Sequence, residues 1–481
     1  MLLVPIAREG PVPIYRQIVE RIVELVDQAT LAPGARLPPT REFARVHAVH
    51  RATVVRAYRD LRALGYLESR PGAYTTVRGR LRPAGVRAGT VASGVRWSVP
   101  GSAAARLAAD EAVPPAPGDA IDFASHAADP TLAPRREVWR AARRVLAADR
   151  SVVASYPDPR GLPELRAVIA RRMAVHGVAA DPDEIVVTNG TQQALDLIFR
   201  MLLGPRPDVV VESPTYGMVL ALLRLHGARV HPVPMAADGL DLDRLRDVIA
   251  RKRPALVYTM PNFHNPTGLT TSQAHREALL AICEARRVPI VEDGFDEELK
   301  YSGPAVLPIK SIDARGVVLY LGTLSKVAFP GLRLGWIVAP AEAAARLTAV
   351  QRVSALGASG LGQAVAAEVL GSSRFEAHLR AAHRVYRHRL QTLVAGLEEH
   401  LPAGVRFTRP EGGYTVWLSV PGRPGEERVL FERIWRAGVK VVAGRTFHVR
   451  PTRVPHFRLS IAWVDEERIR EGCRRLGRAL R

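Results

Sequence analysis

The stretch YLGTLSKVAFPGLRLGW, residues 320–336, places a lysine directly after an apolar segment that is typical of a buried strand. Lys326 is one of only five lysines among 68 basic residues, and the rest are arginines. A lysine amine can lose its proton and attack a carbonyl carbon, whereas arginine stays charged in proteins. The stretch therefore raises two possibilities: a nucleophilic lysine or an ordinary surface residue.

The neighbours of Lys326 favour the first possibility. Thr323 and Ser325 place hydroxyl groups in the turn beyond the strand, and Arg333 follows after a Pro-Gly pair that turns the chain back. Hydroxyl groups and a guanidinium fork suit a phosphate dianion. The stretch predicts a phosphate site beside the lysine.

Other polar residues follow other apolar segments between residues 121 and 481. These segments alternate with helical ones, which predicts an α/β domain with a largely parallel sheet and a ligand site at the carboxyl ends of its strands. Gly190 and Thr191 open a helix, whose free N–H groups form a second anion site. The remaining candidates at strand ends are Tyr216, Asn265 in PNFHNPTG, and Asp293.

Together these motifs resemble the pyridoxal-phosphate enzymes of the aspartate-aminotransferase fold, fold type I, over residues 122–481. The resemblance implies a mostly parallel central sheet, a small C-terminal α/β subdomain and pyridoxal 5′-phosphate as cofactor. It implies that Lys326 forms the internal aldimine, Asp293 pairs with the ring nitrogen, Asn265 bonds the ring oxygen and Tyr216 stacks on the ring. The implied phosphate cup is Gly190, Thr191, Thr323, Ser325 and Arg333, the implied carboxylate fork is Arg458, and Tyr156 and Gly161 resemble residues that border the other subunit's site.

One departure from this family concerns the residues after Asp293. Family members usually place a tyrosine two or three positions later, where it bonds the ring oxygen. This chain has Phe295 and Asp296 there. The departure puts the tuning of the cofactor's proton equilibrium in doubt, more than cofactor binding itself.

The first 80 residues form a separate basic segment, with 13 arginines against 7 acidic residues in a chain of net charge +21. Their pattern predicts three helices and two short strands around Pro71-Gly72, which is a winged helix-turn-helix. The segment resembles the DNA-binding domain of the GntR family. Arg41, Arg51, Thr53, Arg56 and Gly72 are the expected DNA-contacting positions, although a run of helical arginines is often only a solvated face.

The turn between the second and third helices departs from that family. It reads His47-Ala48-Val49-His50 where the family usually has Leu-Gly-Val-Ser. A lost turn glycine with positive φ costs roughly 1 kcal/mol, and a lost serine cap costs about as much. Tyr74 also stands in the wing in place of a second glycine.

Residues 81–120 are rich in Ala, Gly and Pro and are predicted to be a flexible linker between residues 1–80 and 121–481. This layout is similar to the MocR subfamily of bacterial regulators. It implies a DNA-binding transcriptional regulator that senses an amino compound or the cofactor itself, and a head-to-tail homodimer. The alternative is an active amino-acid aminotransferase with a vestigial DNA-binding domain.

The composition also argues against a membrane protein and against a metal or redox site. No run of about 18 apolar residues appears, so we expect no membrane span and a cytoplasmic protein. The two cysteines, Cys283 and Cys473, lie in no metal or redox motif, and both are expected to be reduced and buried. No metal site is expected.

Overall fold

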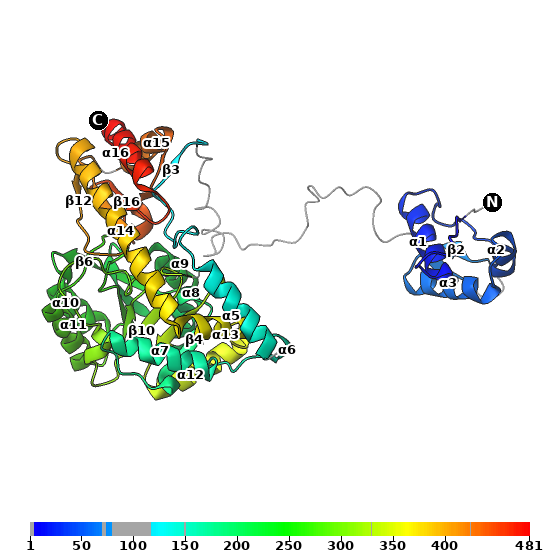
Figure 1. Ribbon diagram of the computed structural model, residues 1–481, viewed down its shortest axis with the longest axis horizontal. Helices are drawn as coiled ribbons and strands as arrows, with labels where there is room; N and C mark the ends of the chain where they lie inside the picture. The colour runs from blue at the N-terminus through cyan, green and yellow to red at the C-terminus, as the bar shows by residue number, and fades with distance from the viewer. Residues whose placement is uncertain (1–3, 70–73, 79–116, 149–150, 329, 424) are drawn as a thin grey trace. The chain divides into compact units, whose positions relative to one another are not determined.

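The computed structural model describes residues 4–69, 74–78, 117–148, 151–328, 330–423 and 425–481 (Figure 1). The chain divides into two compact units, Met1–Val99 and Pro100–Arg481. Most of the predicted linker lies outside the described residues, so its boundaries at 81 and 120 stay a prediction.

The N-terminal unit has the predicted helix–turn–helix–wing order. Its helices are α1 (Ile14–Asp27), α2 (Thr40–Val46) and α3 (Arg51–Ala63), and its wing pairs β1 (Leu67–Glu68) antiparallel with β2 (Thr76–Val77). The apolar stripe of α1 explains the fold, because Ile18 and Ile22 are fully buried against Val54 and Leu61 of α3.

The second unit is built on an eight-stranded sheet of order β4-β11-β10-β9-β8-β5-β6-β7. Neighbouring strands are parallel except at β11 and at the edge strand β7, which confirms the mostly parallel sheet. The strands are β4 (Ile185–Thr188), β5 (Asp208–Ser213), β6 (Arg229–Ala236), β7 (Gly239–Leu240), β8 (Leu256–Thr259), β9 (Ile290–Asp293), β10 (Val318–Thr323) and β11 (Gly335–Val338).

Both faces of this sheet are covered. Val209 and Val211 of β5 enter one apolar cluster with α8 and α9, and Val210 between them enters another with α10 and α11. Alternate side chains of a strand point to opposite faces, which explains the continuous apolar run VVV in this strand. The surrounding helices are α5 (Arg135–Ala148), α6 (Ser151–Ala154), α7 (Pro163–Val175), α8 (Thr191–Leu202), α9 (Gly217–Leu225), α10 (Leu242–Lys252), α11 (Gln273–Arg286), α12 (Ala341–Ala355) and α13 (Gly360–Leu370).

The predicted small C-terminal subdomain is present, at the upper part of the second unit in Figure 1. A four-stranded sheet of order β12-β13-β16-β15 packs with three helices, and β3 pairs in parallel with β14. These elements are α14 (Ser373–His400), β12 (Arg406–Phe407), β13 (Thr415–Ser419), α15 (Glu427–Arg436), β14 (Val439–Lys440), β15 (Val442–Ala443), β16 (His456–Ser460), α16 (Glu466–Leu480) and β3 (Ile121–Asp122).

Two expectations from the composition can be checked here. Both cysteines are free and buried, as predicted. Within the described ranges, every helix is too short or too polar to cross a membrane.

Candidate cofactor and DNA-binding sites

A cavity of about 220 Å³ lies where the strands of the large sheet end. Asp293 is the last residue of β9 and Thr323 the last residue of β10, while Thr191 opens α8. Nine predicted cofactor and effector residues line it together: Thr191, Tyr216, Asn265, Asp293, Thr323, Ser325, Lys326, Arg333 and Arg458.

The tenth predicted residue, Gly190, lies beside Arg333. Its φ is 85°, and a Cβ atom added there would lie 2.8 Å from Arg333 Nη2. The positive φ favours glycine here, and a side chain would crowd the Arg333 guanidinium at the start of α8. Thr323 Oγ1 accepts a hydrogen bond from the Ser325 main-chain N–H at 3.1 Å, which holds the turn before Lys326. Guanidinium, hydroxyls and the helix N-terminus converge here, as a bound phosphate requires.

The Lys326 amine lies inside the site and donates a hydrogen bond to the carbonyl oxygen of His126. Burial lowers the pKa of Lys326 to about 8; the Asp296 and Asp293 carboxylates oppose this shift, and Arg458 and Arg333 add to it. A substantial fraction of the amine is then neutral near physiological pH, as a nucleophile must be.

Asp293 has one bonded and one free oxygen. Its Oδ2 accepts a hydrogen bond of 2.7 Å from the Tyr258 hydroxyl, and Oδ1 is buried with no partner among the described residues. Burial raises the pKa of Asp293 to about 6, so the carboxylate is still charged at neutral pH. Tyr258 was missed from the sequence, although β8 lies beside β9 and brings its ring to Asp293.

Asn265 lies in a loop, residues 261–268, that several side chains hold in place. Arg276 of α11 is fully buried and donates to the carbonyl oxygen of Pro261 at 3.1 Å and to Asn262 Oδ1 at 2.5 Å. Glu212, at the end of β5, lies 3.1 Å from the His264 ring. The loop therefore presents Asn265 from a fixed position, where its Oδ1 accepts from Arg458 Nη1 at 3.4 Å.

Arg458 enters the site from β16 of the smaller sheet. Its Nη2 donates to the carbonyl oxygen of Ala124, and its Nε is buried without a partner in the described part of the chain. Burial lowers the pKa of Arg458 to about 10, which leaves the guanidinium charged at neutral pH. A charged guanidinium with an unused donor suits a carboxylate.

Four further residues line the cavity without having been predicted as ligands: His126, Gln192, Met260 and Phe295. The His126 ring packs against Tyr414 and Phe295 at centroid distances of 5.6 and 6.0 Å. No sequence signal marks His126, because its contacts come from distant parts of the chain.

Phe295 and Asp296 behave differently from each other. Phe295 faces the cavity and brings no hydroxyl. Asp296 lies outside the lining; it is 1% exposed, and neither oxygen has a hydrogen-bond partner among the described residues. Burial raises its pKa to about 7, against the attraction of Lys326.

These residues fit pyridoxal 5′-phosphate, as an observation on each part of that molecule shows. The free Asp293 oxygen suits a protonated ring nitrogen, the Gly190–Arg333 cradle suits the phosphate, and the Lys326 amine suits the aldehyde.

The DNA-contacting candidates lie on the N-terminal unit. Arg41, Arg51 and Arg56 are exposed and Thr53 is partly exposed, while Gly72 lies outside the described residues. The exposed face of α3 forms a shallow hollow lined by His50, Arg51, Ala52, Val55, Arg56 and Arg59. The Arg56 guanidinium lies 3.8 Å from the centre of the Tyr15 ring, so it is less free than Arg51 to reach DNA.

The unusual turn before α3 is explained by its side chains. Ala48 has φ 49°, the left-handed conformation expected for the missing glycine. His50 replaces the serine cap, because its Nδ1 accepts from the Ala52 N–H at 3.2 Å. His47 stacks on Phe43 at 4.1 Å and accepts from the Val4 N–H, so it is a packing residue.

Residues 122–476 match the aminotransferase class I and II family, and residues 14–77 match the gntR family of bacterial regulatory proteins. The chain is 37% identical to a 2-aminoadipate transaminase of Thermus thermophilus, over 75% of this chain and 90% of that one. It is 31% identical to the probable rhizopine catabolism regulatory protein MocR of Rhizobium meliloti, over 98% and 95%.

Among solved structures, one similar fold is LysN, an α-aminoadipate aminotransferase of Thermus thermophilus complexed with N-(5′-phosphopyridoxyl)-L-leucine. The TM-score is 0.70 at 35% identity, and the match covers 76% of this chain and 92% of LysN. The full-length and partial matches agree with the division into two units.

Proposed function

Because this chain belongs to the class I and II aminotransferase family and carries a gntR-type domain in the manner of the MocR regulators, we propose that it is a DNA-binding regulator which senses an amino compound through pyridoxal 5′-phosphate held on Lys326. The observation that carries the proposal is the joint presence of a lysine amine with lowered pKa and an exposed basic recognition helix.

Within the site, each residue has a separate task. Lys326 supplies a neutral amine for covalent attachment, and Asp293 holds a proton on the ring nitrogen through its free oxygen. Thr191, Thr323, Ser325 and Arg333 bind the phosphate, and Asn265 orients the ring. When bound, the cofactor supplies an electrophilic carbon that exchanges one amine for another. Arg458 selects ligands that carry a carboxylate.

For DNA, the proposal assigns phosphate contacts to Arg41 and Arg51 and base contacts to Thr53. Arg51 and Thr53 lie in the first turn of α3, the helix that enters the major groove in this motif. Arg56 has a smaller assigned role than the sequence predicted, since its guanidinium is stacked on Tyr15.

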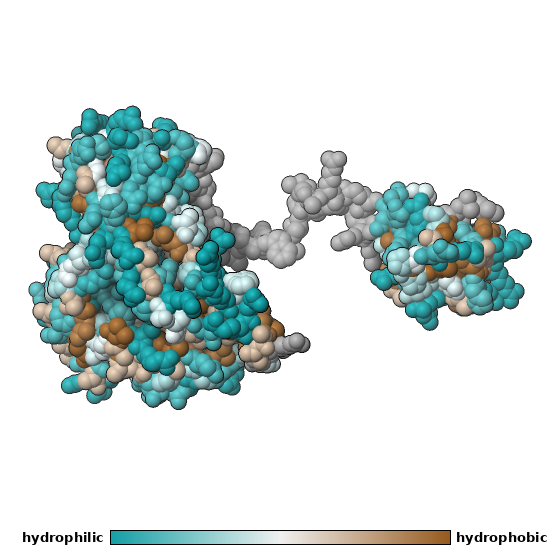
Figure 2. Space-filling model, viewed as in Figure 1, coloured by the Kyte–Doolittle hydropathy of each residue, from teal (hydrophilic) through white to brown (hydrophobic). Residues whose placement is uncertain are grey.

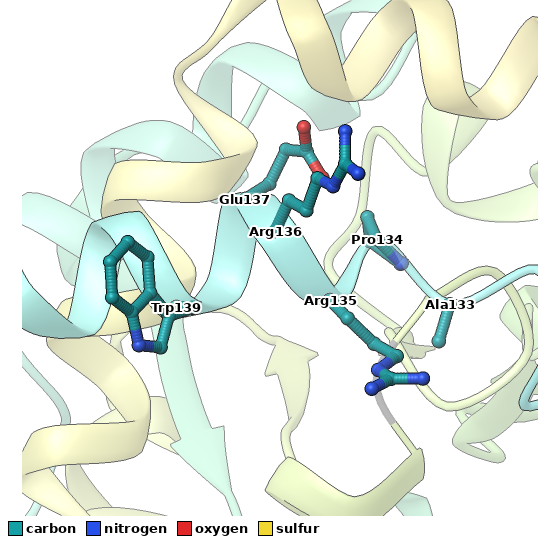
Figure 3. A pocket seen from close by; sticks show the side chains of 6 residues that line it. All are labelled: Ala133, Pro134, Arg135, Arg136, Glu137 and Trp139. Atoms are coloured by element: carbon teal, nitrogen blue, oxygen red, sulfur yellow. The ribbon is translucent and has the colours of Figure 1, made fainter.

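A homodimer is the assembly we propose. Tyr156 is 82% exposed and does not line the cavity. The family resemblance implies that it borders the site of the other subunit instead. The backbone of Gly357 and Gly360 packs on residues 152–159, so two segments meet beside Tyr156. Val153 and Leu356 of these segments are also exposed. A surface hollow of about 700 Å³ at the start of α5, lined by Arg135 and Trp139, adds apolar area on the same unit (Figure 3). On the visible face of the second unit, apolar residues form small patches among hydrophilic ones (Figure 2).

The second candidate is a working amino-acid aminotransferase. It is favoured by the nine predicted cofactor and effector residues that line the cavity and by the 37% identity to a transaminase. Both activities can exist in one chain.

The two candidates predict different results for the purified full-length protein loaded with pyridoxal phosphate. A regulator binds a DNA fragment, selected from a random-sequence pool, with nanomolar and salt-dependent affinity that amino acids alter. An aminotransferase converts its cofactor fully to the amine form and turns over when a keto acid is added. No selected DNA together with rapid turnover would reject the regulator.

A further inference from the structure

His126 lies in the cofactor cavity, and none of the tasks assigned under the proposed function uses its side chain. Its carbonyl oxygen accepts a hydrogen bond from Lys326 Nζ, so its backbone lies beside the amine that would attach the cofactor. Its imidazole ring lines the cavity and packs edge-on against the Tyr414 ring and at an interplanar angle of 55° against the Phe295 ring. The ring is therefore held close to Lys326 and Phe295, where a ligand in the cavity can reach it.

Both ring nitrogens of His126 are buried, and neither has a hydrogen-bond partner among the described residues. Burial, together with the charges of Lys326 and Arg458, lowers the pKa of His126 well below its usual range, so the ring is neutral at physiological pH. A neutral imidazole carries one N–H donor and one acceptor nitrogen. Because buried polar groups in folded proteins are nearly always paired, an unpaired donor in a cavity indicates an acceptor atom on the molecule that fills it.

The surroundings of this donor favour a negatively charged oxygen as its partner. Lys326 and Arg458, the charged groups that act on His126, are both cationic. Asn265 uses its Oδ1 to accept from Arg458 Nη1, which leaves its amide N–H groups for a ligand. Two neutral donors in the company of two cations suit an anionic acceptor.

We propose that His126 is a positioning residue that donates a hydrogen bond to the phenolic ring oxygen of pyridoxal phosphate, and this inference rests on the proposed function. In that cofactor, the phenolic oxygen is bonded to the ring carbon next to the one that bears the aldehyde. Once Lys326 holds the aldehyde carbon, this oxygen comes near the lysine, and His126 lies there as well. Phe295 brings no hydroxyl group to this part of the cavity, so the imidazole supplies the donor that a tyrosine would otherwise give.

This hydrogen bond has a measurable consequence for the nitrogen that links Lys326 to the cofactor. A donor stabilises the negative charge on the phenolic oxygen, and it weakens the hold of that oxygen on a proton of the neighbouring nitrogen. Removal of the donor should therefore raise the pKa of the linking nitrogen. The other charged groups that act on Lys326 stay in place when His126 is replaced; they are Asp293, Asp296, Arg333 and Arg458.

The test is a pH titration of the absorbance of the full-length protein, loaded with pyridoxal phosphate and free of any added amino compound. His126→Phe removes both ring nitrogens and keeps an aromatic ring. It should raise the pKa of the linking nitrogen by about one unit, which is about a tenfold change in proton affinity. Phe295→Tyr, added to His126→Phe, should bring the pKa back toward the native value, because the tyrosine hydroxyl restores a donor.

Two further variants separate this role from a structural one. His448→Phe is the matched control, since His448 Nε2 is also buried without a partner in the described part of the chain but lies outside the cavity lining. It should titrate like the native protein. His126→Gln keeps an N–H donor and should shift the pKa less than His126→Phe does.

The inference is overturned if His126→Phe binds the cofactor and titrates like the native protein, or if its shift persists after Phe295→Tyr is added. If His126→Phe takes up no cofactor, His126→Ala replaces it in the comparison, and equal pKa values for His126→Ala and His126→Gln would overturn the inference. A native chain whose absorbance does not respond to pyridoxal phosphate would instead reject the proposed cofactor site.

Discussion

The cofactor site and the recognition helix use their charged side chains in opposite ways. Asp293, Lys326 and Arg458 are buried, and burial shifts the pKa of each. Arg51 and Arg59 project from an exposed helix face. Ligand binding in the first region depends on individual groups held in place, whereas DNA binding in the second depends on summed charge. A single substitution should therefore have a larger effect on ligand binding than on DNA binding.

The largest effect is expected from Lys326→Ala. The buried amine is the proposed attachment point, so the variant should lose the covalent cofactor absorbance near the visible edge completely. Lys252→Ala, at the exposed end of α10, is the control and should keep the spectrum of the native protein. Retention of the absorbance in Lys326→Ala would remove the central assignment.

Arg458→Gln should come next. It removes a charged donor from a buried site, and a bidentate carboxylate contact corresponds to roughly 2–3 kcal/mol, or about 100-fold in affinity. Spectral titration with a panel of amino acids should show this weakening for every responsive compound. Cofactor affinity should change little, because Arg458 is expected to grip the effector and not the phosphate.

Asp296→Asn tests the interaction between Asp296 and Lys326 through the pH dependence of cofactor capture. The Asp296 charge raises the pKa of Lys326, so its removal should lower that pKa below about 8 and favour the neutral amine at lower pH. The pH midpoint for capture of pyridoxal phosphate should therefore move to acid by about one unit, which is about 1.4 kcal/mol. Glu292→Gln is the control: this carboxyl is equally buried but bonded to the Ile309 and Lys310 N–H groups. An unmoved midpoint in Asp296→Asn would make Asp296 purely structural.

In the exposed region, Arg51→Ala should weaken binding to a selected DNA fragment by about fivefold. It should also reduce the slope of log affinity against log salt concentration by about one. Arg56→Ala should have a smaller effect, because that guanidinium is stacked on Tyr15. Fluorescence anisotropy over a range of salt concentrations measures both. An Arg56→Ala loss larger than that of Arg51→Ala would contradict the assignment of contacts.

The smallest effect concerns stability of the N-terminal unit. Ala48→Gly should raise its free energy of unfolding by about 0.5–1 kcal/mol, because glycine adopts the observed φ of 49° without strain. Ala52→Gly, inside α3, should lower it by a similar amount. Native-state hydrogen exchange over residues 14–77 of the full-length chain reads both, and equal signs for the two variants would refute the argument.

The sequence predicted which candidate residues come together, because most of them follow strands. A strand pattern places a residue such as Asp293 at a known edge of the sheet, and ten candidate residues come together there. Tyr258 and His126 were not predicted as site residues, because their contacts depend on strand neighbours and packing between distant segments. The stacking of Arg56 on Tyr15 also escaped prediction, since helical periodicity gives a face and not a rotamer.

The order of the large sheet has a consequence for synthesis on the ribosome. Among the described strands, β4 pairs only with β11, and the cavity also needs Arg458 of β16. The core of the winged helix, by contrast, is built from residues 4–77, in the first part of the chain to emerge. A nascent or truncated chain thus acquires a folded DNA-binding module long before any module able to receive a ligand. Under the proposed function, shortened products would bind DNA without responding to an effector.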